Sequence, residues 1–243
     1  MHYSIALDGP AGVGKSTIAK ALAEKLHFIY IDTGAMYRAL GVFFLEKGLS
    51  AADEAGICAV LPDVQVSICY ADGEQHVLLN GKDVTAKLRT EAVSAMASVT
   101  SQYQKVREKL TALQRGLAAQ ENVIMDGRDI GTVVLSDANL KIFLTAQSAV
   151  RAKRRYDQLL QQGKLGSLSL AELEQDMEAR DYRDMHRENA PLCQAKDAVL
   201  VDSSKMTAAQ VETQILSLFL TRCKEDASMQ ATAAHALSQL HSS

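Results

Sequence analysis

The stretch Leu7–Lys20, LDGPAGVGKSTIAK, decides the fold, because it holds a glycine, four further residues and then Gly-Lys-Ser, a pattern that grips phosphate. Residues 3–8, which lead up to the glycine, are mostly apolar and strand-like. Residues 15–26, which begin at the lysine, place apolar side chains at helical spacing. The pattern requires a strand, a glycine-rich turn and a helix, in that order. The sequence therefore predicts a phosphate-binding loop.

In such a loop the backbone N–H groups and the N-terminus of the following helix face the phosphates of a nucleotide. Lys15 is suited to the β and γ phosphates, and the Ser16 hydroxyl is suited to Mg²⁺. The residues expected to contact the nucleoside triphosphate are Gly9, Pro10, Ala11, Gly12, Val13, Gly14, Lys15, Ser16 and Thr17. A chance match in a glycine-rich turn is the weaker alternative. The loop names no reaction, because GTPases, motors, small-molecule kinases and switches share it.

Strand-like and helical segments alternate along most of the chain. Further strands are expected at 28–31, 122–126, 140–144 and 198–202, and further helices at 36–45, 103–120, 148–162, 170–188 and 207–220. This alternation predicts an α/β fold with three layers, α/β/α, around a parallel sheet of five strands. Residues 64–70 and 76–79 break the pattern and predict a small antiparallel hairpin, inserted as part of a binding surface.

Length and composition favour one domain. The chain has 243 residues, 47% of them hydrophobic, and we expect a single domain over 1–221 followed by a tail, 222–243, that is either a weakly docked helix or disordered. A net charge of −3 gives no general attraction to nucleic acid, and no apolar run is long enough to span a membrane. The four cysteines lack metal-site spacing, which favours reduced thiols in the cytoplasm.

Two predicted helices carry arginines at helical spacing. They are Arg151, Arg154 and Arg155 in the first, and Arg180, Arg183 and Arg187, with Asp184, in the second. A planar guanidinium meets phosphate oxygens in bidentate fashion, so two such faces around a glycine-containing connection suit a lid, about residues 151–187, that closes over phosphates. The alternative is a solvated helix face with a weak Arg180–Asp184 ion pair.

The segment 125–131, MDGRDIG, places charged side chains directly after an apolar strand. In an open α/β sheet, ligands bind beyond the carboxyl ends of the strands, so these side chains are expected near the phosphate-binding loop. Asp126 could hold Mg²⁺ through water, and Arg128 could hold the phosphate of an acceptor. The alternative is an ordinary polar turn.

Several segments together resemble the bacterial type of cytidylate kinase, a group of nucleoside monophosphate kinases. The matching stretches are Asp8–Ser16, Asp32–Arg38, Asn80–Thr85, Arg89 with Thr90, Asp126–Val134, Lys141–Leu144, Arg180–Asp184 and Ala190–Leu192. The resemblance covers nearly all of the chain up to about residue 220. It implies transfer of the γ-phosphoryl group of ATP to CMP or dCMP, with Mg²⁺ required, in pyrimidine nucleotide metabolism. It also favours a monomer.

The resemblance implies a role for each matching residue. The implied CMP-binding residues are Thr33, Arg38, Ser98, Arg107, Arg128, Asp129, Arg180, Asp184 and Arg187. Arg151, Arg154, Arg155 and Arg183 would belong to the lid around ATP, and the expected catalytic residues are Lys15, Arg128, Arg151, Arg155 and Arg183. Ser16 would ligate Mg²⁺ directly and Asp126 through water. The hairpin, within about 62–92, would enlarge the monophosphate-binding region.

Two departures from the family pattern are visible. Gly-Lys-Ser-Thr stands where the family often has Gly-Lys-Gly followed by Ser or Thr, and Thr33 stands where serine is also seen. Both changes keep a hydroxyl. The nearest alternative is a kinase of another small acceptor, such as adenylate or shikimate. A nucleotide-dependent switch is a different class, but it would want an Asn-Lys-x-Asp guanine motif, which is absent here.

Overall fold

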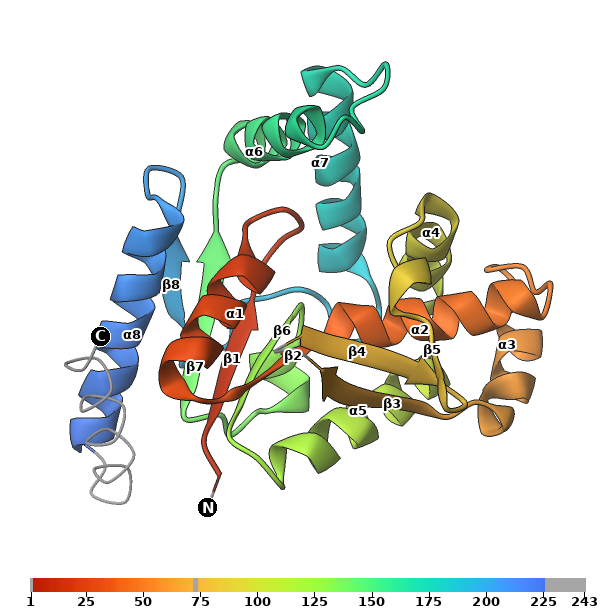
Figure 1. Cartoon of the computed structure of the whole chain (residues 1–243), viewed down its shortest axis with the longest axis horizontal. Coiled ribbons are helices and arrows are strands. Elements are labelled where there is room, and N and C mark those ends of the chain that lie inside the picture. The colour runs from red at the N-terminus through yellow and green to blue at the C-terminus, as the bar shows by residue number, and fades with distance from the viewer. Residues whose placement is uncertain (1, 72–73, 226–243) are drawn as a thin grey trace. The chain divides into compact units, whose positions relative to one another are not determined.

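The computed structural model describes residues 2–71 and 74–225 (Figure 1). Contacts between residues divide the chain into two compact units, each described by itself. The sheet unit has described residues 2–30 and 121–225, and the hairpin unit has described residues 31–71 and 74–120. The expectation of a single domain over 1–221 is not tested by this division and stays a prediction.

The sheet unit is built on the predicted five-stranded sheet. Its strands are β1 (Ser4–Asp8), β2 (Ile29–Asp32, at the boundary of the units), β6 (Val123–Gly127), β7 (Leu140–Thr145) and β8 (Val199–Asp202). Their order is β2-β6-β1-β7-β8, with β1 in the middle, and β1 pairs in parallel with both β6 and β7. The carboxyl ends of these strands therefore reach the same edge of the sheet. The fold class predicted from the sequence is confirmed in its parallel sheet and in the separate antiparallel one.

The helices of the sheet unit are α1 (Lys15–Leu26), α6 (Ser148–Gln161), α7 (Leu170–His186) and α8 (Ala208–Glu225), and a π-helical turn spans Ile130–Val134. Helices α1 and α8 bury their apolar faces on this sheet, whereas α6 and α7 pack against each other. Ile18, Leu22 and Leu26 of α1 share a core with Phe219 of α8, whose ring meets Phe28 edge-on at 5.6 Å. A fully buried ring such as Phe219 contributes about 3–5 kcal/mol against truncation to alanine.

Two helix ends differ from the sequence predictions. The last helix continues to Glu225, so residues 222–225, expected in the tail, belong to α8, where Cys223 is fully buried in the core. The rest of the predicted tail lies outside the described residues. Helix α7 ends at His186, and Arg187 has an extended backbone with ψ 144°. The prediction that Arg187 continues the arginine face of this helix is therefore wrong.

The described part of the hairpin unit contains the predicted antiparallel insertion, four α-helices and two short 3₁₀ turns. Strands β3 (Val66–Ala71), β4 (Glu74–Leu79) and β5 (Lys82–Asp83) form the sheet β3-β4-β5. The α-helices are α2 (Thr33–Glu46), α3 (Glu54–Val60), α4 (Glu91–Thr100) and α5 (Gln104–Ala118), and Leu61–Asp63 and Thr85–Lys87 are short 3₁₀ turns. Helix α2 starts three residues earlier than predicted, because the Asp32 carboxylate caps it by accepting from the Ala35 N–H at 2.8 Å.

Candidate active site

The phosphate-binding loop leaves the end of β1 in a backbone path that needs glycine. Gly9 has φ 150°, and a Cβ atom there would lie 2.0 Å from the carbonyl oxygen of Leu144. Gly14 is the N-cap of α1, with φ 97° and no side-chain hydrogen bond to the helix. Because Gly14 has no side chain, it caps none of the N-terminal N–H groups of α1. Uncapped N–H groups at a helix N-terminus favour the binding of an anion.

Lys15 begins α1 and is held inside the loop. Its side chain is buried, and its Nζ donates to the carbonyl oxygens of Gly9 at 2.8 Å and Pro10 at 2.7 Å. Burial lowers the pKa of this ammonium well below its usual value, and the charge of Arg128 lowers it further, against the opposing effect of Asp126 and Asp8. A phosphate arriving beside Lys15 would favour the charged form.

Ser16 and Asp126 meet at the ends of α1's first turn and β6, as the sequence suggested. The Ser16 hydroxyl donates to Asp126 Oδ2 at 2.9 Å, and the Tyr30 hydroxyl donates to Asp126 Oδ1 at 2.9 Å. No role was predicted for Tyr30. The only signal in the sequence is its position within the predicted strand 28–31, which assigns its side chain to one face of the sheet. The oxygen-rich set suits Mg²⁺, which keeps most of its waters and takes one or two protein oxygens beside substrate phosphates.

The turn after β6 is tied to the end of α7 by two ion pairs. Arg128 Nε donates to Asp184 Oδ2 at 2.7 Å, and Arg187 Nη2 donates to Asp129 Oδ1 at 3.3 Å. Asp129 and Arg187 are both buried. All four residues were predicted from the sequence to bind the acceptor, and the structure brings them together in two pairs. Asp184 pairs with Arg128, in place of the Arg180–Asp184 pair weighed as the alternative.

The predicted lid arginines have different surroundings. Arg151 is buried, pairs with Asp181 and donates to the Ala11 carbonyl oxygen at 2.8 Å, while Asp181 accepts from the Ala11 N–H at 3.0 Å. Arg154 donates to the carbonyl oxygen of Ser203 at 2.7 Å. The remaining three, Arg155, Arg180 and Arg183, are exposed. Arg151 and Asp181 thus hold both backbone groups of a loop residue, although no role was predicted for Asp181.

The hairpin unit carries the other predicted acceptor residues. Arg38 Nη2 donates to Asp32 Oδ2 at 2.9 Å, so the residue that caps α2 also orients this arginine. Arg107 is buried, donates to the Ser101 carbonyl oxygen at 3.2 Å and lies 5.8 Å from the Tyr37 ring centre. Thr33 is buried at the start of α2, and Ser98 is partly buried in α4.

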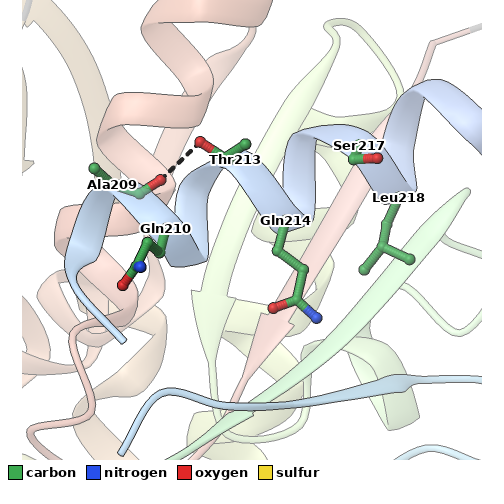
Figure 2. Close-up of a pocket in the computed structure, with 6 residues that line it drawn as sticks. All are labelled: Ala209, Gln210, Thr213, Gln214, Ser217 and Leu218. Atoms are coloured by element: carbon green, nitrogen blue, oxygen red, sulfur yellow. Dashed lines mark hydrogen bonds between the residues drawn. The ribbon is translucent and has the colours of Figure 1, made fainter. Parts of the chain in front are cut away.

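A surface pocket lies elsewhere, along one face of α8 (Figure 2). Its lining residues are Ala209, Gln210, Thr213, Gln214, Ser217 and Leu218. None of them is charged, and none was predicted to bind or react. Thr213 Oγ1 uses its donor on the Ala209 carbonyl oxygen at 2.8 Å. This pocket is therefore not the candidate active site.

Two searches of the described residues bear on other kinds of site. Across 2–71 and 74–225, no helix is long and apolar enough to cross a membrane. Over the same part of the chain, His, Cys, Asp and Glu side chains do not gather in threes that could hold a metal ion.

The whole length of the chain up to Thr221 resembles known cytidylate kinases. The cytidylate kinase family profile matches residues 5–221. The chain belongs to the cytidylate kinase family. Curated members include a cytidylate kinase from Caldicellulosiruptor saccharolyticus, 49% identical over 89% of this chain and 95% of that protein. Another, from Desulfitobacterium hafniense, is 47% identical over 90% of this chain and 93% of that protein.

A solved structure supports the fold alone. The chain is similar, with a TM-score of 0.51 and 14% identity, to an uncharacterized protein from Eubacterium ventriosum, over 90% of this chain and 98% of that one. At that identity the likeness concerns the path of the backbone. The likeness in sequence to cytidylate kinases is what bears on the chemistry of this family member.

Proposed function

We propose that this chain is a cytidylate kinase, which transfers the γ-phosphoryl group of ATP to CMP or dCMP to give the diphosphate and ADP. Its place would be pyrimidine nucleotide metabolism in the cytoplasm, and its working form a monomer. Membership of the cytidylate kinase family supports the reaction. The observation that carries it is that β1 and β6, neighbours in one sheet, end side by side in a phosphate-binding loop and in the Arg128-Asp129 turn.

The donor would be held by the loop, 9–17, with Lys15 on its β and γ phosphates. When bound, Mg²⁺ would neutralise phosphate charge, and the oxygens of Ser16 and Asp126 suit it. The ion pair of Arg151 with Asp181 fixes the backbone of Ala11, so Arg151 would support the loop. The exposed Arg155 and Arg183, and Arg154, are proposed to reach ATP when the lid, about 151–187, closes.

The acceptor would be held by arginines and carboxylates. In the sheet unit, Arg128 would grip its phosphate and Asp129 would accept from the exocyclic amine of cytosine. The other proposed contacts are Arg180, Asp184 and Arg187 of the sheet unit, and Thr33, Arg38, Ser98 and Arg107 of the hairpin unit. The CMP phosphate is already an anion near neutral pH, so positioning and neutralisation can carry the reaction with no general base.

A substrate panel tests this proposal. ADP formation from ATP is measured with CMP, dCMP, UMP, AMP and shikimate in turn, and CMP or dCMP should give the highest kcat/KM. A preference for AMP or shikimate would establish the other small-molecule kinase. Slow ATP turnover that no acceptor accelerates would favour a nucleotide-dependent switch.

Variants test the assigned roles. Lys15→Ala and Arg128→Ala should each reduce kcat by about a hundredfold or more while circular dichroism stays unchanged, because each removes charge stabilisation of the transferring group. Lys25→Ala is the matched control, since Lys25 is exposed in the last turn of α1 and its ion pair is with Glu212 of α8. Near-normal turnover in folded Lys15→Ala or Arg128→Ala contradicts the mechanism.

A further inference from the structure

Asp8 is a buried carboxylate that the proposed reaction does not use. It is the last residue of β1, directly before the phosphate-binding loop, and only 4% of its surface is exposed. In the register of the sheet it lies opposite Gly127, the residue before Arg128. Beyond this point the two strands diverge: β1 continues into the phosphate-binding loop, and β6 continues into the turn that carries Arg128 and Asp129.

The Asp8 side chain, at the end of β1, bonds the turn that follows β6. Its Oδ1 accepts from the Ile130 N–H at 2.8 Å, and its Oδ2 accepts from the Gly131 N–H at 2.7 Å. These are the first two N–H groups of the π-helical turn Ile130–Val134, which have no partner within the turn. Asp8 therefore satisfies them from a distant part of the sequence.

Asp129 stands at the N-cap of that turn and does not cap it. Aspartate is among the residues that most often cap their own helix, yet Asp129 makes no side-chain cap hydrogen bond, and its Oδ1 accepts from Arg187. We infer that Asp8 is a positioning residue: its carboxylate caps the turn in place of Asp129, which leaves the Asp129 carboxylate directed to the acceptor. This inference rests on the proposed function.

The packing around this contact is close. A Cβ atom added at Gly131 would lie 3.2 Å from Lys141 Cδ, a tight contact, and 3.4 Å from Asp8 Oδ2, an ordinary one, so the Lys141 side chain packs directly against this turn. Burial raises the pKa of Asp8 to about 6, and the hydrogen bonds from Gly131 and Ile130 lower it in part. The nearby charges are Asp129, which raises it, and Lys15, which lowers it. The two N–H groups therefore offset part of the free-energy cost of burying the charged carboxylate.

Asp8→Asn is the variant that tests the inference. An asparagine has one oxygen for two N–H groups and turns an NH₂ donor toward the other, so the cap is lost while the shape is kept. The preference for CMP over UMP, measured as a ratio of kcat/KM values, should fall about tenfold, the effect of one lost hydrogen bond to a charged group. The KM for ATP should change less than twofold. Thr132→Val is the matched control in the same turn, because Thr132 Oγ1 is buried without a hydrogen-bond partner among the described residues.

A double-variant cycle shows whether Asp8 acts through Asp129. In the Asp129→Ala background the substitution Asp8→Asn should not change the CMP preference further. Independent, multiplying effects overturn the inference, as does an unchanged preference in folded Asp8→Asn or an equal rise of both KM values. If Asp8→Asn does not fold, Asp8→Glu decides the question, since one more methylene moves the carboxylate away from the N–H groups of Ile130 and Gly131 while the charge is kept: a reduced preference supports the inference and an unchanged one overturns it. Wild-type enzyme inactive on CMP would instead refute the proposed function.

Discussion

The ion pair of Arg151 and Asp181 gives a prediction that can be worked from the structure. Both side chains are nearly inaccessible, at 7% and 8% exposure, and Asp181 also accepts from the Ala11 N–H of the phosphate-binding loop at 3.0 Å. Asp181→Ala leaves a buried guanidinium without its counter-charge and a loop N–H without its acceptor. Breaking a buried pair from one side costs about 3–5 kcal/mol of the free energy of unfolding.

Arg151 keeps two acceptors in that variant, the carbonyl oxygens of Ala11 at 2.8 Å and Ala146 at 3.0 Å. They place the expected loss near the lower end, about 3 kcal/mol. Urea denaturation followed by circular dichroism measures it. Asp157→Ala is the matched control, because its pair with Lys153 is exposed and contributes under about 0.5 kcal/mol.

A second variant separates pairing from other effects. In Arg151→Ala/Asp181→Ala no charge is left buried alone, so the double variant should lose clearly less stability than the sum of the single losses. The reasoning is refuted if Asp181→Ala lies within about 1 kcal/mol of the wild type, or if the two single losses simply add.

Two further predictions concern the carboxyl end of β1. Since the pKa of Asp8 is raised from 3.8 to about 6, its contribution to stability is present below pH 4 and is lost as the pH rises through 6. Over that range the free energy of unfolding of Asp8→Asn, measured by urea denaturation, should rise by up to about 3 kcal/mol relative to the wild type. A difference that does not change with pH would contradict this. Gly9→Ala should lower the free energy of unfolding by more than about 4 kcal/mol, because its Cβ would lie 2.0 Å from the Leu144 carbonyl oxygen. The control is Gly116→Ala in helix α5, where a Cβ has no atom within 4 Å and should add about 0.5–1 kcal/mol. Similar melting temperatures for the two variants would refute this.

The main strands and helices could be predicted because their apolar patterns are long and regular. Helices α3 and α4 were missed, although Asp53 and Thr90 cap them through the N–H groups of Gly56 and Val93. Helix α3 has seven residues, too few for a clear period, and α4 is rich in small and β-branched residues, which suit other structures equally well. Their apolar faces are defined by tertiary packing, as where a Cβ at Gly41 would lie 3.1 Å from the Val93 carbonyl oxygen.

The candidate site was predictable in its residues and less so in its partners. Spacing on a helix suggested a pair of Arg180 with Asp184, yet Asp184 bonds Arg128, 56 residues away. It also suggested that Arg187 extends the helical face, but the helix ends one residue earlier and Arg187 reaches Asp129. Local spacing gives the contacts that a helix permits, whereas the parallel sheet determines which distant segments compete for the same side chain.

Three side chains to which the sequence predictions gave no role, Asp8, Tyr30 and Asp181, share one property. Each is buried, and each bonds a group that belongs to, or directly follows, a predicted site residue: Ile130, Asp126 and Ala11. A residue that touches no ligand leaves no ligand-binding motif, so only the fold can reveal it. Because Asp8 directly precedes the phosphate-binding loop and also caps the acceptor turn, its side chain links the loop to the turn. The two substrate-binding elements of the sheet unit are therefore expected to move as one body, and rearrangement during the reaction should concentrate in the exposed arginines of α6 and α7, Arg155, Arg180 and Arg183.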